Sequence, residues 1–121
     1  MRPNPTPGPL GERERQVIST VIDGLLLADA DGLRKQLETA RVVGGLPTFL
    51  SLEVDRNARR AAWIDGPQPG RAVVTKPGGE PVGEILVWTS DGYLTALEYA
   101  WYSDDPPVEW PDPAWLTIEH E

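Results

Sequence analysis

The chain contains no cysteine and no long apolar run, and each absence excludes a class of protein. Without a thiol there is no disulfide framework, no thiolate metal site and no cysteine nucleophile. No apolar stretch reaches the roughly 18 residues that a membrane-spanning helix needs. The polar, proline-rich residues 1–9 are also unlike a signal peptide. We therefore expect a cytoplasmic protein with no membrane partner.

Side chains suited to catalysis are scarce as well. The single histidine, His120, lies one residue from the C-terminus, where chains usually fray, whereas a Ser-His-acid triad must hold its histidine in place. The densest group of oxygen ligands lacks the central glycine and closing glutamate of a calcium loop; it consists of Asp104, Asp105, Glu109 and Asp112. We expect no catalytic residue, no metal site and no cofactor, which favours a non-enzymatic protein.

Glycine and proline are abundant, at 12 and 13 of the 121 residues, while hydrophobic residues make up 40%. That hydrophobic share is sufficient for a core, and the length is typical of one domain. Prolines at positions 3, 5, 7 and 9 keep the N-terminus out of helices and central strands. The sequence therefore predicts a flexible proline-rich arm over residues 1–11 and a single domain over residues 12–121.

Two helices are expected at the start of this domain. Apolar residues recur at helical spacing from Glu12 to Ala28 and form one stripe. Asp29 or Asp31 is a suitable N-cap for a second helix ending near Val42, after which Gly44-Gly45 supplies a left-handed stop.

Strands are expected in most of the remaining chain. Residues 50–54 alternate between apolar and polar, a long loop covers 55–70, and strands are predicted over 71–76, 82–90 and 93–102. Residues 115–118 are expected to form a short last strand or a docked extension. Helices followed by consecutive hairpin-linked strands are typical of the α+β class. We predict two N-terminal helices packed on one face of a mainly antiparallel sheet of four to five strands.

The Asp-Gly pair at residues 91–92 is the strongest turn signal in the chain. A two-residue type I′ turn needs positive φ at both positions, which these residues tolerate. A uniform register from this turn places Glu84 opposite Tyr99 and Glu98 opposite Ile85. The two glutamates would then lie on opposite faces and share no site.

The residues around this turn resemble a known group of proteins. The motif reads Glu-Ile-Leu-Val-Trp at 84–88, then Asp-Gly-Tyr-Leu-Thr-Ala-Leu-Glu at 91–98, then a proline-rich acidic end, and a helical segment at 33–42 precedes it. Together these resemble a family of small bacterial α+β proteins of uncharacterised function. Many of its members carry cysteines before the first strand, where this chain has Gly44-Gly45-Leu46-Pro47, so no cysteine role carries over.

Charge is distributed unevenly along the chain. The formal net charge is −8, yet all 11 basic residues lie at or before Lys76, so residues 1–76 sum to +2 and residues 77–121 to −10. The acidic part also holds four of the five tryptophans and all three tyrosines. An acidic segment that is rich in aromatic residues is expected to fold rather than remain a solvated tail.

Residues 101–115, here called the aromatic segment, are the candidate for partner binding. Tryptophan and tyrosine anchor many protein interfaces, and fixed negative charge steers a basic partner toward them. The predicted partner-binding residues are Trp101, Tyr102, Asp104, Asp105, Glu109, Trp110, Asp112 and Trp115. In the alternative interpretation, Trp110 and Trp115 clamp the segment onto the domain's own core while the acids face water.

Three functional hypotheses follow. The leading one is a non-enzymatic protein-binding module, with an immunity or inhibitor role against a basic effector as its sharpest form; some bacterial immunity proteins are similar acidic α+β proteins. The second is a small-ligand-binding domain or hydrolase with a pocket between helices and sheet. The third is a structural homo-oligomer. The acidic surface disfavours direct nucleic-acid binding, and Arg56, Arg59 and Arg60 are expected to be a solvated loop or an ion-pair partner for the acidic end.

Overall fold

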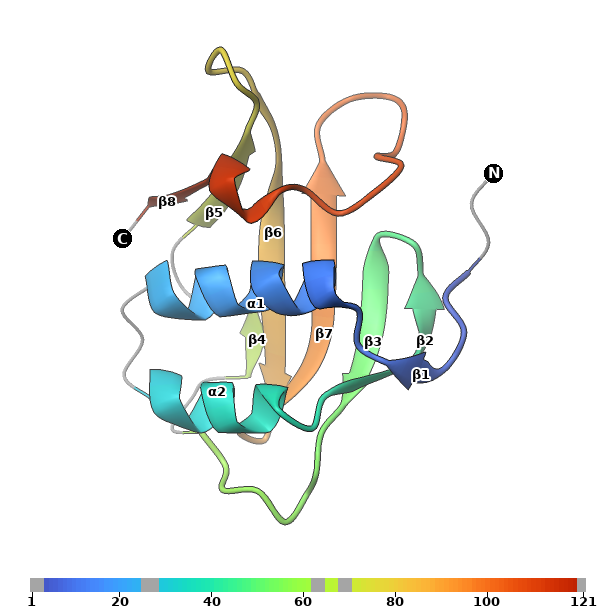
Figure 1. The fold of residues 1–121 in the computed structure, drawn as a ribbon, viewed down its shortest axis with the longest axis vertical. Helices are drawn as coiled ribbons and strands as arrows, with labels where there is room; N and C mark the ends of the chain where they lie inside the picture. The colour runs from blue at the N-terminus through green and yellow to red at the C-terminus, as the bar shows by residue number, and fades with distance from the viewer. Residues whose placement is uncertain (1–3, 25–28, 62–64, 68–70, 120–121) are drawn as a thin grey trace.

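A computed structural model describes residues 4–24, 29–61, 65–67 and 71–119 as one antiparallel sheet covered on one face by two helices (Figure 1). The elements in chain order are β1 (Gly8–Pro9), α1 (Glu12–Gly24), α2 (Ala30–Leu37), β2 (Arg41–Leu46), β3 (Phe49–Glu53), β4 (Gly66–Pro67), β5 (Arg71–Thr75), β6 (Pro81–Ser90), β7 (Tyr93–Trp101), the 3-10 turn η1 (Pro113–Trp115) and β8 (Leu116–Glu119). The strand order is β1-β2-β3-β7-β6-β5-β8, with β4 paired to β6. The α+β class is confirmed, but the sheet has eight strands, so the expected four to five was too low.

Helix α1 forms where the apolar stripe predicted it. Val17, Ile18, Val21 and Ile22 are at most 1% exposed and face the sheet. The helix ends at Gly24 in the described residues, and the expected continuation over 25–28 lies outside them. Neither helix in the described part of the chain is long and apolar enough to cross a membrane.

Helix α2 begins as expected and ends early. The Asp29 carboxylate accepts a hydrogen bond from the Gly32 amide at 3.2 Å, which identifies Asp29 as the N-cap. The helix stops at Leu37, so the prediction that it continues to about Val42 was wrong. Residues 41–46 instead form β2, in which the glycines 44–45 accommodate a bulge rather than ending a helix. At Gly45, with φ of 113°, a Cβ would lie 2.1 Å from the Phe49 carbonyl oxygen.

The β6–β7 hairpin turns at Asp91 and Gly92, with φ of 53° and 81°, as the sequence predicts. Beyond the second pair of residues the uniform register fails, because β7 carries one extra residue between Leu94 and Ala96. Every later pair is shifted by one, so Glu84 faces Ala100 and Glu98 faces Leu86. Both glutamates consequently lie on the same sheet face, away from the helices, and the prediction of opposite faces was wrong.

A polar side chain connects the helices to this hairpin inside the core. Gln36 of α2 is 0% exposed. Its Nε2 donates to the carbonyl oxygens of Gly92, at 2.7 Å, and Arg59, at 3.1 Å. Its Oε1 accepts from the Leu94 amide at 2.9 Å. All of its principal hydrogen-bonding groups are therefore satisfied, as buried polar groups normally are.

The end of the proline-rich arm lies on the sheet. Gly8 and Pro9 pair with Val42 and Arg41 of β2, and Leu10 is 6% exposed in the core. A two-residue edge pairing is compatible with a proline-rich sequence, because an edge strand can leave one side of its backbone unpaired.

Candidate functional site

The aromatic segment crosses the helix-covered face of the molecule. After β7 ends at Trp101 the chain loops outward, returns in front of β7 and β6 above α1, and reaches β8 at the sheet edge (Figure 1). The Tyr102 amide donates to the Val82 carbonyl oxygen at 3.0 Å, which continues the β6–β7 pairing to the start of the loop. Of the two alternatives for residues 115–118, the structure has the short strand, as β8 over Leu116–Glu119, paired with β5.

Trp110 holds the middle of the segment against the core. Its side chain is 5% exposed, and its ring centroid lies 6.1 Å from that of Tyr99. Arg13 of α1 donates from Nη1 to the Trp110 carbonyl oxygen at 3.3 Å. Trp115, at the end of η1, is partly buried against the same core. The two tryptophans thus occupy the positions that the clamp interpretation requires.

The start of η1 is fixed locally. Asp112 is its N-cap, and its Oδ1 accepts from the Ala114 amide at 2.9 Å. Pro113 follows at the first position of the turn, where a missing N–H costs nothing. Asp112 therefore has a structural contact in addition to its exposed charge.

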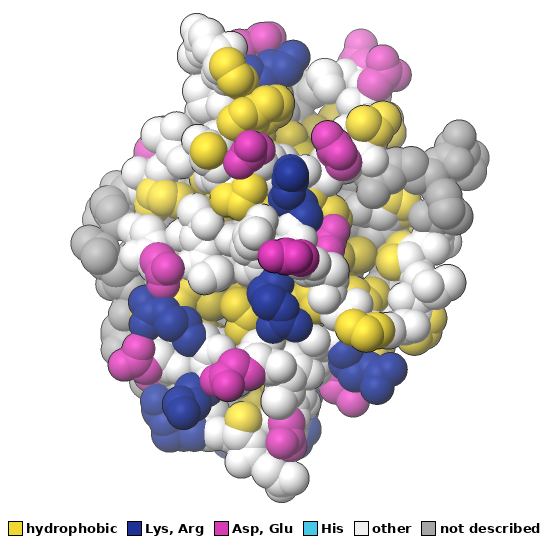
Figure 2. Space-filling view, in the orientation of Figure 1, with side chains coloured by type: hydrophobic (Ala, Val, Ile, Leu, Met, Phe, Trp, Pro, Cys, Tyr) yellow, Lys and Arg dark blue, Asp and Glu magenta, His cyan; other side chains and the backbone are white. Residues whose placement is uncertain are grey.

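The remaining predicted partner-binding residues face solvent. Trp101 is 37% exposed and Tyr102 is 50% exposed. Between them and Trp110, Val108 is 78% exposed. The four carboxylates of the segment are all exposed as well; they are Asp104, Asp105, Glu109 and Asp112. Figure 2 shows yellow apolar side chains at the upper part of this face with acidic side chains beside them.

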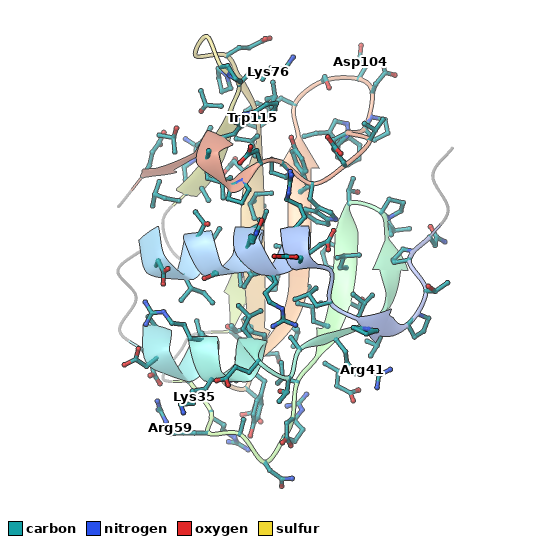
Figure 3. All side chains as sticks on the ribbon, viewed as in Figure 1. Lys35, Arg41, Arg59, Lys76, Asp104 and Trp115 are labelled. Atoms are coloured by element: carbon teal, nitrogen blue, oxygen red, sulfur yellow. The ribbon has the colours of Figure 1, made fainter. Side chains whose placement is uncertain are left out.

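None of these carboxylates forms an ion pair with another described residue. Among the described residues, every ion pair uses Arg34, Arg59, Arg60 or Arg71 as the cation, and none uses an acid of the aromatic segment. Arg59 is bound to Asp29 at 2.8 Å and Arg60 to Asp91 at 3.2 Å. Of the two alternatives for the 56–60 cluster, pairing with the acidic end is therefore wrong for the described residues, whereas the three arginines are exposed as a solvated loop requires. Figure 3 shows Arg59 at the end of the molecule opposite Asp104.

Arg56 of the same basic cluster has an aromatic partner instead. Its guanidinium carbon lies 4.4 Å from the centroid of the Tyr93 ring. The Tyr93 hydroxyl donates toward the carbonyl oxygens of Arg56 and Ala58, at 3.2 Å and 3.3 Å. The cluster thus contacts the loop after β3 and, in the described residues, forms no ion pair with the acids of the aromatic segment.

A pocket of about 540 Å³ lies beneath the aromatic segment. Its aromatic walls come from both the sheet and the segment, namely Tyr99, Trp101, Trp110 and Trp115. Its charged residues are Arg13, Lys76, Asp105, Glu109 and Asp112. Figure 3 shows Lys76 and Trp115 at the same end of the sheet as Asp104. The volume is within the usual range for small-ligand sites, about 300–1,000 Å³.

The sequence predicted the acidic residues and tryptophans of this pocket, but not the lining residues that lie outside the aromatic segment. Arg13, Lys76 and Val82 come from α1, the β5–β6 turn and β6, and no local pattern links them to residues 101–115. Tyr99 of β7 also lines the pocket, and it is 6% exposed. Burial raises the pKa of its hydroxyl.

The opposite sheet face carries a polar network that touches Tyr102. Its hydroxyl lies 3.2 Å from both Glu84 Oε2 and Arg71 Nη2. The hydrogen bond and the charge of Glu84 raise the pKa of Arg71. On the same face Trp88 donates from Nε1 to Glu98 at 3.0 Å. Each glutamate therefore has its own partner, and we see a structural network there rather than an acid–base pair.

No group of three or more acidic, histidine or cysteine side chains converges as a metal site within the described residues; His120 is outside them. Comparisons with protein-family models, curated proteins and solved structures found no significant match to the chain. The resemblance of the hairpin motif to a bacterial family thus stays a prediction, and functional interpretation depends on the aromatic segment and its pocket.

Proposed function

We propose that this protein is a non-enzymatic protein-binding module that docks a basic protein on residues 101–112. The observation that supports this most directly is a set of four exposed carboxylates that form no ion pair with any described residue, on a segment that also exposes Trp101 and Val108. Tyr102 is exposed as well, but its hydroxyl contacts Glu84 and Arg71 on the opposite sheet face, so it is not an anchor of this surface. Exposed charge of one sign accelerates association with an oppositely charged partner. Exposed aromatic side chains supply the anchors that hold it.

The docking surface is anchored to the core at its C-terminal end. Trp110 is buried, Arg13 binds its carbonyl oxygen, and Asp112 caps η1. A surface fixed before binding loses less conformational entropy when the partner arrives. The clamp and the recognition surface are therefore compatible, because buried Trp110 fixes the loop from which the acids project.

The most specific form of the proposal is an immunity or inhibitor protein that covers a functional surface of a basic effector. It is motivated by charge complementarity, since the acidic surface would oppose a cationic one. A gene for a large toxin-like protein next to this one would favour this form. Inhibition of that purified protein at a one-to-one ratio would be its biochemical test.

The general proposal is tested by neutralising the segment. In the test variant Asp104, Asp105 and Asp112 become Asn and Glu109 becomes Gln, which keeps an oxygen acceptor at the cap of η1. In the control variant the exposed residues Glu12, Glu38, Glu53 and Glu80 become Gln, so the net charge changes equally. Partners are captured from lysate of the source cells and identified by mass spectrometry. Their association rates with all three proteins are then measured at low and high salt.

We expect the test variant to associate at least about tenfold more slowly at low salt, and the control variant to change much less. An association rate that is insensitive to salt and equal in the test variant and the wild type would refute the proposal.

The small-ligand alternative is favoured by a separate observation, the 540 Å³ pocket with four aromatic walls. Binding of a small molecule from a metabolite library, detected by nuclear magnetic resonance at the indole N–H groups, would support it. A variant with Tyr99→Phe tests whether that binding uses the pocket.

A further inference from the structure

The pocket under the aromatic segment gathers four of the chain's nine aromatic residues. Trp101, 37% exposed, lies toward solvent, while Trp110 and Tyr99, at 5% and 6%, lie deeper. Aromatic faces carry negative electrostatic potential and attract cations, tryptophan most strongly. The wall composition therefore favours a flat or cationic occupant over an aliphatic one.

The Tyr99 hydroxyl supplies a second, independent observation. It forms no hydrogen bond with any described residue, although Tyr99 is 6% exposed. The other two tyrosine hydroxyls are bonded, Tyr93 to backbone carbonyl oxygens and Tyr102 to Glu84 and Arg71. Buried polar groups nearly always have partners. The phenolic oxygen can accept a hydrogen bond from a donor that enters the pocket.

The charges around the pocket favour a cation. Asp105, Glu109 and Asp112 outnumber Arg13 and Lys76 by one. The guanidinium of Arg13 already donates to the Trp110 carbonyl oxygen, whereas none of the three carboxylates pairs with a cation in the described part of the chain. Negative charge is thus available for an incoming donor.

We infer that this pocket receives an arginine side chain of the basic partner, stacked on the tryptophan walls and donating to the Tyr99 hydroxyl and the rim carboxylates. This inference rests on the proposed protein-binding function and names the chemical group recognised. Arginine fits better than lysine because its planar guanidinium stacks on aromatic rings and directs five donors in a fixed plane. A lysine ammonium is more strongly hydrated and loses more on entering the pocket.

The test uses three short peptides and does not need the partner. N-acetylated, amidated Gly-Arg-Gly, Gly-Lys-Gly and Gly-Leu-Gly are titrated into the isotope-labelled protein, and the indole N–H resonances are followed. We expect the arginine peptide to shift the resonances of Trp101, Trp110 and Trp115, and to bind several-fold more tightly than the lysine peptide. The leucine peptide should cause much smaller shifts at the same concentration.

Two variants that differ from the wild type by a single oxygen atom make the test specific. Tyr99→Phe removes the pocket hydroxyl and keeps the ring, and should weaken arginine-peptide binding about three- to tenfold. Tyr93→Phe removes a hydroxyl at the opposite end of the molecule and should leave that affinity unchanged. Retained dispersion of the amide spectrum shows that each variant folds.

Equal shifts with the arginine and leucine peptides, or equal affinities in the two tyrosine variants, would overturn the arginine assignment. Either result is independent of the partner-association measurements, since those depend on surface charge and salt. If association still slows on neutralising the carboxylates, the docking proposal stands without the arginine pocket. If association is unchanged while the arginine peptide binds, the pocket has a ligand but the docking proposal fails.

Discussion

Replacing Gln36 is the sharpest test of how the helices are joined to the hairpin. Gln36→Met keeps a side chain of similar length and removes three hydrogen bonds, to Gly92, Arg59 and Leu94. The Gly92 carbonyl oxygen retains its bond from the Ala61 amide at 2.8 Å. The Leu94 amide loses its partner while Leu94 stays 1% exposed. The substitution therefore leaves one backbone donor buried and unpaired.

The cost follows from these contacts. Each lost hydrogen bond removes about 1 kcal/mol, and the orphaned Leu94 amide adds about 1–3 kcal/mol. Methionine buries more apolar surface than glutamine, which raises the free energy of unfolding by about 1 kcal/mol. We expect the free energy of unfolding to fall by about 3–5 kcal/mol in urea titrations with an unchanged m-value. The control is Gln16→Met at an exposed position of α1, which should change that free energy by less than about 0.5 kcal/mol.

A second substitution at this position adds a pH dependence with a definite sign. In Gln36→Glu the new carboxylate would face the two carbonyl oxygens that Nε2 now contacts. Burial and these acceptors raise its folded-state pKa above the unfolded value of about 4.3. Between the two values only the folded chain keeps the proton, so the free energy of unfolding falls by about 1.4 kcal/mol per pH unit as pH rises. A Gln36→Met cost below about 1 kcal/mol, or a pH-independent Gln36→Glu, would refute the reasoning.

Three other expectations concern the segment, the pocket and β2. Trp110→Ala should lower the free energy of unfolding by about 3–5 kcal/mol, because the Trp110 side chain is buried. Trp101→Ala should lower it by less than about 1.5 kcal/mol, because Trp101 is partly exposed. Equal losses in urea titrations would contradict the clamp. Burial raises the pKa of Tyr99, so the unfolded chain loses the hydroxyl proton at lower pH than the folded chain. The free energy of unfolding should therefore fall as pH rises above about 10, and Tyr99→Phe should weaken this trend. Matching pH profiles in the two proteins would refute the expectation. Gly45→Ala should lower the free energy of unfolding by at least about 1 kcal/mol, because φ is 113° and the added Cβ would lie 2.1 Å from the Phe49 carbonyl oxygen. At Gly8 an added Cβ would meet nothing within 4 Å, so Gly8→Ala should show no comparable loss in urea titrations.

Local patterns predicted the elements whose signals are local. The apolar stripe located α1, and Asp91-Gly92 located the β6–β7 turn. The alternation after Pro47 located β3. Each of these depends on periodicity or turn chemistry within about ten residues, where sequence and structure are most directly linked.

The errors in secondary structure and register arise where local signals are ambiguous or too short. Glycines 44–45 were interpreted as a helix stop, yet glycine serves equally at a bulge between two strands. The bulge in β7 was hidden because Leu94, Ala96 and Leu97 are all apolar, so alternation did not mark the extra residue. The two-residue strands β1 and β4 are too short to show any period.

The pocket could not be predicted because the residue shift in β7 helps to form it. The shift places Trp101 opposite Gly83, where uniform pairing would have placed it opposite Val82. A Cβ on Gly83 would lie 2.8 Å from Cε1 of the Tyr99 ring, so the glycine leaves room for that ring. The ring then meets Trp110, which reaches it from a loop that no pairing rule places. One unmarked residue in a strand therefore decides where two walls of the candidate site lie.

Charge and shape make separable contributions to the proposed binding. The carboxylates of the aromatic segment act over roughly the 10 Å that salt screening permits, so their effect belongs to the association rate and fades at high ionic strength. The ring walls and the Tyr99 hydroxyl act only at contact, so their effect belongs to the dissociation rate. An acidic surface without the pocket would bind basic proteins quickly and indiscriminately. The buried Trp110 keeps the two together, because the same loop that it fixes carries the acids and forms the pocket wall. Selectivity for one basic partner then depends on the side chain that enters the pocket.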